Sequence, residues 1–342
     1  MSGSISQLAL AGGFRRGLNE TVPYHPATMP TTIPKPRALV GSPAAGPGAG
    51  RNPGPLVSAA WVNEHLGDED LRIVHVAPNR RVYNKRHLPG AIRSDLHAEL
   101  ALRGTAPETG DAEREWLVPT RDQVLNVLRK WRVGTGDRLV LYDDVGLNRQ
   151  AIRGYWLLRM YGFPRDRIHI MDGGIGAWRR AGFETTTDVP ESDLADGHRP
   201  PVELGERDDT FLATYEEVLN WSREATNPNG PTRILDVRTA GEFVGTDLRA
   251  RRGGHIPGAR QRCFVDLLTD EGTFRAVDEM VALIRASGVE LDEVRATYCQ
   301  GGVRAALVWF VLRELAGYED VKSYAGSWEE WGNRPDSPIE RA

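Results

Sequence analysis

The chain has 342 residues, of which 40% are hydrophobic and 26% charged, with a formal net charge of −4 at pH 7. That length allows two or three domains, and the composition is that of an ordinary globular protein, without the positive charge that would favour nucleic acid or an anionic membrane as a partner. It contains two cysteines, no Cys-x-x-Cys pair and no apolar run approaching the roughly 18 residues of a membrane span, which excludes a disulfide scaffold and a membrane-spanning helix and gives no reason to expect a metal site.

The first 54 residues differ from the rest of the chain in composition. They are rich in Gly and Pro, have few bulky apolar side chains and contain five Lys or Arg against one Glu. Such a segment cannot bury enough apolar surface to offset its ordering entropy, so we expect a disordered tail over residues 1–54. Arg15, Arg16 and the scarcity of acids are also weakly typical of an organelle transit peptide, and a misassigned start codon is a third alternative. We expect a cytoplasmic protein. If the tail is a transit peptide, the alternative location is the mitochondrion or another organelle.

From Leu56 onward the two halves of the chain repeat each other. The sequence His-Leu-Pro-Gly-Ala at residues 87–91 recurs as His-Ile-Pro-Gly-Ala at residues 255–259. Three further blocks recur in the same order: 72–76 with 233–237, 137–143 with 293–299, and 172–178 with 325–331. Matched blocks in a preserved order indicate a tandem duplication. The polar, Pro-containing stretch between the halves is typical of a linker, so we predict domains at 56–184 and 208–338 joined by a linker at 185–207.

Strand and helix patterns alternate in each half. In the second half we predict strands and helices in the following order: strand 233–237, helix 277–287, strand 294–298, helix 305–315 and strand 321–324. Such alternation implies a parallel sheet covered on both faces by helices. We predict an α/β fold of two three-layer domains packed face to face, with ligands bound beyond the carboxyl ends of the strands.

The segment Cys299–Arg304, with the sequence Cys-Gln-Gly-Gly-Val-Arg, connects a predicted strand to a predicted helix. Two consecutive glycines let the backbone curl with its N–H groups directed inward, and the helix N-terminus adds partial positive charge at the same point. Arg304 adds a permanent positive charge. A negatively charged sulfur on Cys299 is stabilised by these groups, so we predict that Cys299 is a nucleophile. The other cysteine, Cys263, is expected to be structural.

Three signatures in the sequence resemble those of the tandem-domain rhodaneses, the thiosulfate sulfurtransferases of bacterial type. They are the segment Tyr83–Ala91, the loop that starts at Cys299 and the segment Tyr324–Gly332, and the resemblance covers about 56–338. It implies two rhodanese-like domains of which only the second is catalytic, and no organic cofactor or metal. The first half agrees with this pattern, because Asp143 stands where Cys299 stands in the repeat.

The resemblance also implies a double-displacement mechanism. Cys299 would take sulfane sulfur from thiosulfate or a similar donor as a persulfide and pass it to cyanide or another thiophilic acceptor. The residues implied to bind the substrate are Gln300, Gly301, Gly302, Val303 and Arg304. Asp236 and Arg238 are expected to support the loop as an ion pair. The expected partners are a small-molecule sulfur donor and acceptor, and a monomer is plausible because the duplication already makes a pseudo-dimer.

Three alternative functions remain open at this point. A 3-mercaptopyruvate sulfurtransferase is disfavoured because Glu242 stands where many such homologues have Arg, and because the loop lacks their Gly-Ser-Gly run. A persulfide carrier that delivers sulfur to a protein partner would keep the same loop. A cysteine phosphatase needs five residues between Cys and Arg, whereas four separate Cys299 from Arg304.

Several other residues have a structural and a functional interpretation. We expect His87 and His255 to be structural, because both halves have them and only one half has the cysteine. Trp328 and Trp331 are expected either to line the cleft or to belong to the core. The cations Lys322, Arg249, Arg251 and Arg252 are expected to be solvated rather than to attract an anionic donor.

Overall fold

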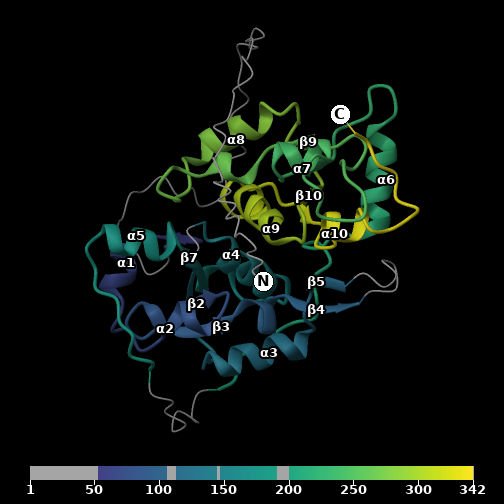
Figure 1. Ribbon diagram of the computed structural model, residues 1–342. Coiled ribbons are helices and arrows are strands. Elements are labelled where there is room, and N and C mark those ends of the chain that lie inside the picture. The colour runs from purple at the N-terminus through teal and green to yellow at the C-terminus, as the bar shows by residue number, and fades with distance from the viewer. Residues whose placement is uncertain (1–52, 106–112, 145–146, 191–199, 342) are drawn as a thin grey trace, which may run out of the picture. The chain divides into compact units, whose positions relative to one another are not determined.

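The computed structural model describes residues 53–105, 113–144, 147–190 and 200–341 (Figure 1). Nearly all of the predicted tail 1–54 and the middle of the predicted linker 185–207 lie outside the described residues. Within the described part of the chain, no helix combines the length and the apolar character needed to cross a membrane.

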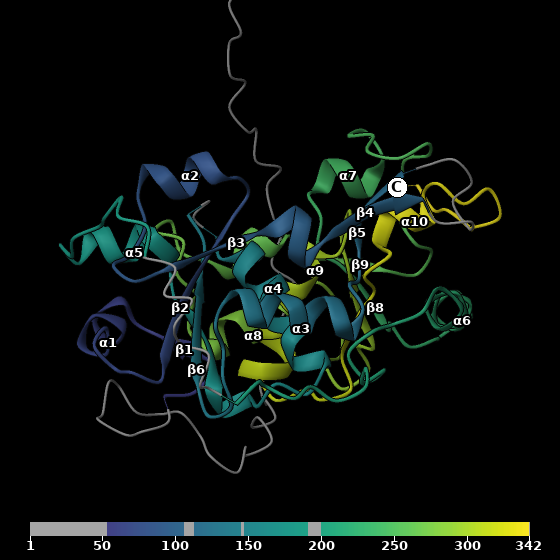
Figure 2. The same cartoon turned by 90° about the horizontal axis from the view of Figure 1, so that it is seen from below.

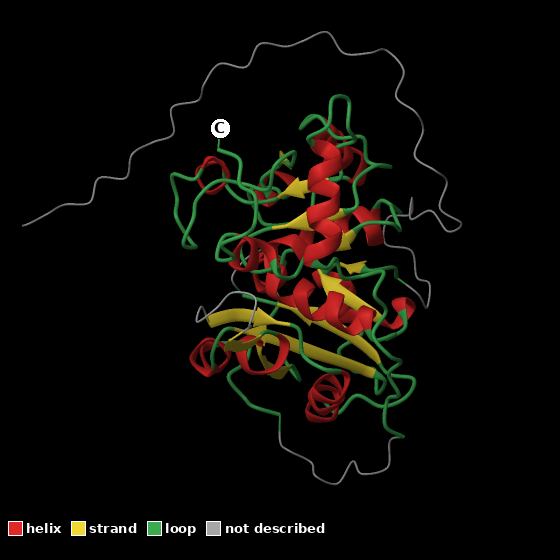
Figure 3. Ribbon diagram, turned by 90° about the vertical axis from the view of Figure 1, so that its right-hand side faces the viewer, coloured by secondary structure: helices red, strands yellow, loops and turns green. Residues whose placement is uncertain are grey.

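The first domain is built on a sheet of five parallel strands in the order β1-β7-β6-β2-β3. The strands are β1 (Leu56–Val57), β2 (Leu71–Ala77), β3 (Ile92–Asp95), β6 (Arg138–Tyr142) and β7 (Ile168–Met171). The central strands β2 and β6 are almost entirely buried, as their apolar runs require for a sheet covered on both faces. The strands of the sheet are covered by helices above and below (Figure 3).

The second domain repeats this arrangement. Its four strands are parallel in the order β11-β10-β8-β9, and a bridge between Leu212 and Ser323 occupies the place of the β1–β7 pairing. The strands are β8 (Ile234–Asp236), β9 (Arg260–Gln261), β10 (Ala296–Tyr298) and β11 (Lys322–Ser323). The same strand order in both halves confirms the predicted pair of α/β domains with parallel sheets.

The helices follow the strands in both domains. The first domain has α1 (Ala59–Glu64), α2 (Arg80–Lys85), α3 (Arg121–Lys130), α4 (Arg149–Met160) and α5 (Gly174–Arg180). The second has α6 (Tyr215–Ala225), α7 (Ala240–Val244), α8 (Val277–Arg285), α9 (Val303–Trp309) and α10 (Ser327–Trp331). The helices α3, α6 and α7 each begin with a capping box, in which a Thr side chain and a Gln or Glu three residues later satisfy backbone N–H groups that the helix leaves unpaired.

Two features of the fold differ from the sequence prediction. An antiparallel hairpin, β4 (Leu102–Thr105) and β5 (Glu113–Leu117), is inserted in the first domain, whereas the equivalent place in the second domain has only a single antiparallel bridge, between Leu268 and Phe274. It extends toward the second domain near α10 (Figure 2). The predicted helix 305–315 begins earlier, at Val303, and continues from Phe310 to Leu315 as a π-helix.

The two domains contact each other through equivalent helices, α4 of the first and α9 of the second (Figure 1). Tyr155 of α4 lies edge-on to Phe310, with ring centroids 4.9 Å apart. Arg159 of α4 forms an ion pair with the buried Glu314, at 3.3 Å. The apolar residues between the helices form one continuous core cluster, which places the carboxyl end of β10 beside the first domain.

Candidate active site

Cys299 lies directly after β10, at the carboxyl end of the strand, where its side chain is 1% exposed. The loop curls so that the backbone N–H of Gly302 donates a hydrogen bond to Cys299 Sγ, at 3.1 Å. A backbone N–H directed at a sulfur favours negative charge on that sulfur. The predicted active loop, Cys299–Arg304, therefore has the geometry of an anion-stabilising turn around its own cysteine.

The glycine at position 302 is required by this turn. Gly302 is the N-cap of α9 with φ +89°, a left-handed conformation that side chains disfavour. A Cβ at this position would also lie 3.0 Å from the carbonyl oxygen of Ala325. Both observations mean that a larger residue at position 302 would displace the loop from the segment that contains Ala325.

That segment is the start of the third sequence signature, and it holds the loop by main-chain and hydroxyl contacts. The Cys299 N–H donates to Ser327 Oγ at 3.1 Å, and the Ser327 hydroxyl donates to the Tyr324 carbonyl at 2.7 Å. The Trp328 N–H donates to the Cys299 carbonyl at 3.0 Å. Ser327 is thus a site residue that the sequence analysis did not single out, although it belongs to a block repeated in both halves.

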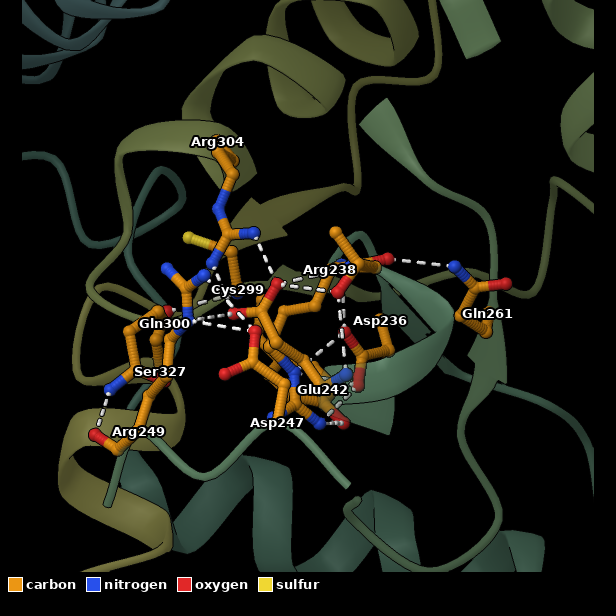
Figure 4. Close-up of polar contacts among 12 residues, drawn as sticks. Asp236, Arg238, Glu242, Asp247, Arg249, Gln261, Cys299, Gln300, Arg304 and Ser327 are labelled. Carbon is orange, nitrogen blue, oxygen red and sulfur yellow. Dashed lines mark hydrogen bonds and ion pairs between the residues drawn. The ribbon is translucent and has the colours of Figure 1, made fainter. Parts of the chain in front are cut away.

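Arg304 is not directed freely at the sulfur but is paired with Glu242 on α7. Its two terminal nitrogens donate to the two carboxylate oxygens of Glu242, at 2.6 and 2.7 Å (Figure 4). Burial favours the neutral acid, but the hydrogen bonds and the positive charge from Arg304 outweigh it and lower the pKa of Glu242 to about 2. Glu242, which stands where many mercaptopyruvate enzymes have Arg, is therefore the carboxylate that compensates the charge of Arg304.

This ion pair predicts a specific dependence of stability on acid. Because the folded-state pKa of Glu242 lies below its ordinary value of 4.5, the pair contributes stability above about pH 4.5 and loses it as the pH falls toward about 2. Glu242→Gln is expected to lower the free energy of unfolding at neutral pH and to flatten its decline over this pH range. Urea unfolding across the range measures both effects. The exposed Glu216 on α6, changed to Gln, is the control, and a decline in Glu242→Gln as steep as in the wild type would contradict the assignment.

Gln300, which follows Cys299 in the loop, contacts the segment around Arg249. The Gln300 side-chain amide donates to the Arg249 carbonyl at 2.8 Å, on the loop between α7 and β9. The Arg249 side chain lies 3.1 Å from Asp247 and 3.6 Å from Glu242. The candidate binding residue Gln300 thus fixes the edge of the site to the Arg249 loop.

Asp236 and Arg238 form the ion pair expected from the sequence. Both side chains are fully or almost fully buried, and two nitrogens of Arg238 lie within 2.6 to 3.0 Å of the Asp236 carboxylate. Arg238 also donates to the Gly254 carbonyl at 2.8 Å and lies over the ring of Trp328, 4.5 Å from its centroid. The pair connects the end of β8 to α10, and hence to the segment that holds the active loop.

The remaining candidates occupy structural positions. The two histidines, His87 and His255, stack on Tyr83 and Phe243 and pair through their backbones with distant segments, the same arrangement in both domains. Trp328 and Trp331 are buried in the core. Lys322 binds Glu217, and the side chain of Arg252 donates to four carbonyls of the segment 331–337. Cys263 is half-buried, and burial raises the pKa of its thiol.

The equivalent loop of the first domain carries no sulfur. Asp143 follows β6 and is fully buried, and its carboxylate accepts the N–H groups of Asn148 and Gln150 at 3.2 and 3.0 Å. Burial raises the pKa of Asp143 to about 6 in spite of these hydrogen bonds. In the first domain a carboxylate thus accepts backbone N–H groups near the place where Sγ accepts one in the second domain.

Comparison with known proteins agrees with this geometry. The Rhodanese-like domain family matches residues 58–181 and again residues 216–334. The thiosulfate sulfurtransferase of Corynebacterium glutamicum is 33% identical over 84% of this chain and 91% of its own length, and the sulfur carrier protein TtuD of Thermus thermophilus is 30% identical over 84% and 97%. The structure of the 3-mercaptopyruvate sulfotransferase SseA from Escherichia coli matches with a TM-score of 0.63 and 26% identity over 80% of this chain and 98% of that one. The chain therefore belongs to the rhodanese family of sulfurtransferases, with two rhodanese domains in tandem.

Proposed function

We propose that the protein is a thiosulfate sulfurtransferase that carries the transferred sulfur as a persulfide on Cys299. The observation that carries the proposal is the hydrogen bond from the Gly302 N–H to Cys299 Sγ, within a turn at the start of α9. A sulfur held in this way is stabilised as an anion, which is the form that attacks a sulfur donor. The relative from Corynebacterium named thiosulfate sulfurtransferase supports the choice of donor.

The proposed reaction has two displacement steps. In the first, the Cys299 thiolate attacks the outer sulfur of thiosulfate, an S–S bond forms on Cys299, the S–S bond of thiosulfate breaks, and sulfite leaves with the electron pair. In the second, cyanide attacks the outer sulfur of the persulfide, a C–S bond forms, the S–S bond of the persulfide breaks, and its electron pair stays on Cys299 as the restored thiolate while thiocyanate is released. Neither step requires an oxidant, a reductant or a metal, because in each step the transferred sulfur exchanges one bond for another and the electron pair of the broken bond stays with the leaving group.

Each loop residue then has a defined part in the reaction. The Gly302 N–H donates to the sulfur, and in the proposed mechanism the main-chain N–H groups from Gln300 to Ala305 stabilise the negative charge that remains on sulfur in both steps. Val303 begins α9 and is buried, so it anchors the turn. Arg304 is held by Glu242 and contributes to the shape of the loop. Because the Glu242 carboxylate compensates its charge, Arg304 adds little to the positive potential at the sulfur. The first domain supplies a wall of the site and no nucleophile.

Glu242 supports thiosulfate over 3-mercaptopyruvate as the donor. A 3-mercaptopyruvate site requires a cation that binds the substrate carboxylate. Here both terminal nitrogens of Arg304 are bound to the Glu242 carboxylate, and Arg249 lies between Glu242 and Asp247. We therefore expect 3-mercaptopyruvate to be the poorer donor.

Persulfide delivery to a protein partner is the second candidate function. Leu248, the neighbour of Arg249 in the loop that binds Gln300, is 65% exposed and would be available to an apolar contact from such a partner. The Thermus relative named a sulfur carrier protein has the same two-domain length. The small-molecule acceptor remains our first proposal because the complete loop is retained.

Initial rates with two donors test the proposed function. We expect kcat/KM for thiosulfate to exceed that for 3-mercaptopyruvate about tenfold or more. The carboxylate of bound 3-mercaptopyruvate would lack a cationic partner in the site, and such a loss lowers kcat/KM by at least that factor. Thiocyanate formation at saturating cyanide gives both values. A preference for 3-mercaptopyruvate would overturn the donor assignment, and no turnover with either donor by a folded protein with an alkylatable Cys299 would favour the carrier.

A further inference from the structure

A cavity of about 440 Å³ lies in the first domain, among α2, the start of β3 and the C-terminal end of α3. Two of the residues that line it, Val189 and Pro190, come from the segment after α5. The volume falls within the range of small-molecule sites, roughly 300–1,000 Å³. Both α2 and α3 lie away from α9, which carries the active loop (Figure 1). The cavity is therefore separate from the site around Cys299.

The side chains that line this cavity carry an excess of positive charge. Four of them are cations: Arg80, Arg93, Lys130 and Arg132. None of the described residues that line the cavity is acidic. The whole chain has a net charge of −4, so this group of cations is a local feature and does not follow from the composition.

Two carboxylates beside the cavity compensate part of this charge. Arg93 Nη1 donates to Asp95 at 3.2 Å. Lys130 is paired with Glu99, whose other carboxylate oxygen already accepts the Ser94 hydroxyl at 2.8 Å. An arginine has five N–H donors and a lysine three, so these contacts use only part of the donors of Arg93 and Lys130. Both cations therefore keep N–H groups with which to bind a ligand.

The cations are close enough to one another for their charges to repel. Burial and the positive charges of Arg93 and Arg80 lower the pKa of the Lys130 ammonium group, and the negative charge of Asp95 opposes them only in part. The positive potential in the cavity thus exceeds what the neighbouring carboxylates neutralise. A negatively charged ligand would relieve this repulsion.

Another part of the cavity wall is apolar and is held in place by a histidine. Ile92, Val189 and Pro190 form this part, and the side chain of Val189 is 62% exposed. The segment that carries Val189 is fixed to the domain by His87, whose Nε2 lies 3.1 Å from the Asp188 carbonyl oxygen. The apolar wall therefore stands beside the cations without a ligand to order it.

We propose that this cavity binds a small organic phosphate, with the phosphate groups on the four cations and the organic part against the apolar wall. Guanidinium groups match phosphate oxygens bidentately, and a lysine adds a point charge. Four cations beside two carboxylates favour a ligand with at least two negative charges, such as a nucleoside diphosphate. The proposal is independent of the sulfur transfer proposed above, because it uses none of the residues of the active loop.

Isothermal titration calorimetry in 150 mM NaCl tests this proposal, with ADP, pyrophosphate and inorganic phosphate as probes and no divalent metal. At this ionic strength, attraction by distant surface charges is screened beyond about 8 Å. ADP and pyrophosphate carry similar negative charge, so their comparison isolates the organic part. We expect ADP to bind about tenfold more tightly than pyrophosphate, since burying about 60 Å² of apolar surface gives that factor. Inorganic phosphate is expected to bind more weakly than either.

Arg80→Gln tests the cationic part of the cavity. It is expected to weaken ADP binding about tenfold, because it removes hydrogen bonds between charged groups, and Arg80→Glu is expected to abolish binding. Arg80 is exposed, so neither change should impair folding. Arg81→Gln is the matched control, because Arg81 is the next residue of α2, is also exposed and does not line the cavity. It is expected to change the Kd by less than about twofold.

No binding of ADP to the wild type, or equal weakening by Arg80→Gln and Arg81→Gln, would overturn the proposal. Pyrophosphate that binds as tightly as ADP would overturn the assignment of an organic ligand. The Cys299→Ser variant is expected to bind ADP like the wild type. Loss of ADP binding in that variant would place the ligand at the active loop and would also overturn the proposal.

Discussion

Cys299→Ser is expected to lower thiocyanate formation from thiosulfate and cyanide by about a thousandfold or more, because a hydroxyl at this position is neither ionised nor able to hold a sulfane sulfur. The serine side chain is close in size to that of cysteine. The Gly302 N–H, which donates to Sγ in the wild type, also stays in place. The loss should therefore appear in kcat with little change in stability. The rate assay and a urea unfolding curve on the same sample measure both.

Cys263→Ser is the control for this prediction. Cys263 is half-buried directly before a short 3-10 helix, Phe264–Leu267, and the proposed mechanism gives its thiol no part in the reaction. Its variant should retain most of the wild-type activity. Equal losses in the two variants would show that a thiol at position 299 is not the sulfur acceptor.

Asp236→Asn is expected to be the most destabilising of the conservative substitutions at the site. It leaves the buried guanidinium of Arg238 without its carboxylate, and breaking a buried ion pair from one side costs about 3–5 kcal/mol. That is a large part of the 5–15 kcal/mol typical of a folded domain. The active loop should loosen as well, because the pair is connected to it through Trp328.

The free energy of unfolding in urea measures this cost. Arg207→Ala is the comparison, since Arg207 and Asp209 form an ion pair in which both side chains are largely exposed, and such pairs contribute about 1 kcal/mol or less. A loss below about 1 kcal/mol for Asp236→Asn would mean that the buried pair does not support the site in the way described.

The active loop could be predicted from sequence because its geometry is local. A strand end, two glycines and a helix start follow one another within a few residues, and they place Cys299 and Gly302 without reference to the rest of the chain. The parallel sheets were predictable for a related reason. The repeated blocks mark equivalent strand ends in both halves, and covered parallel strands are apolar throughout.

The partners of the loop could not be predicted because they come from distant parts of the chain. Glu242 was recognised as unusual, but its pairing with Arg304, 62 residues further on, depends on where α7 and α9 meet. Ser327 reaches the loop only through the packing of α10. The hairpin was missed because its equivalent in the second half is reduced to the single bridge between Leu268 and Phe274, so the repeat gave no signal for two strands.

Strand lengths differed from the prediction for a physical reason as well. The apolar run 294–298 forms a strand only over Ala296–Tyr298, because pairing in register with the neighbouring strands β8 and β11 begins at Ala296. Apolar patterning reports burial, whereas a strand also requires a partner in register.

The central claim is that sulfur resides on Cys299 between the two displacements. Mass spectrometry of the protein after incubation with thiosulfate, followed by removal of the reagent, tests it directly. The account predicts the added mass of one sulfur atom on the peptide that contains Cys299, lost again when cyanide is added. No added sulfur, or sulfur found on Cys263 in its place, would contradict the account.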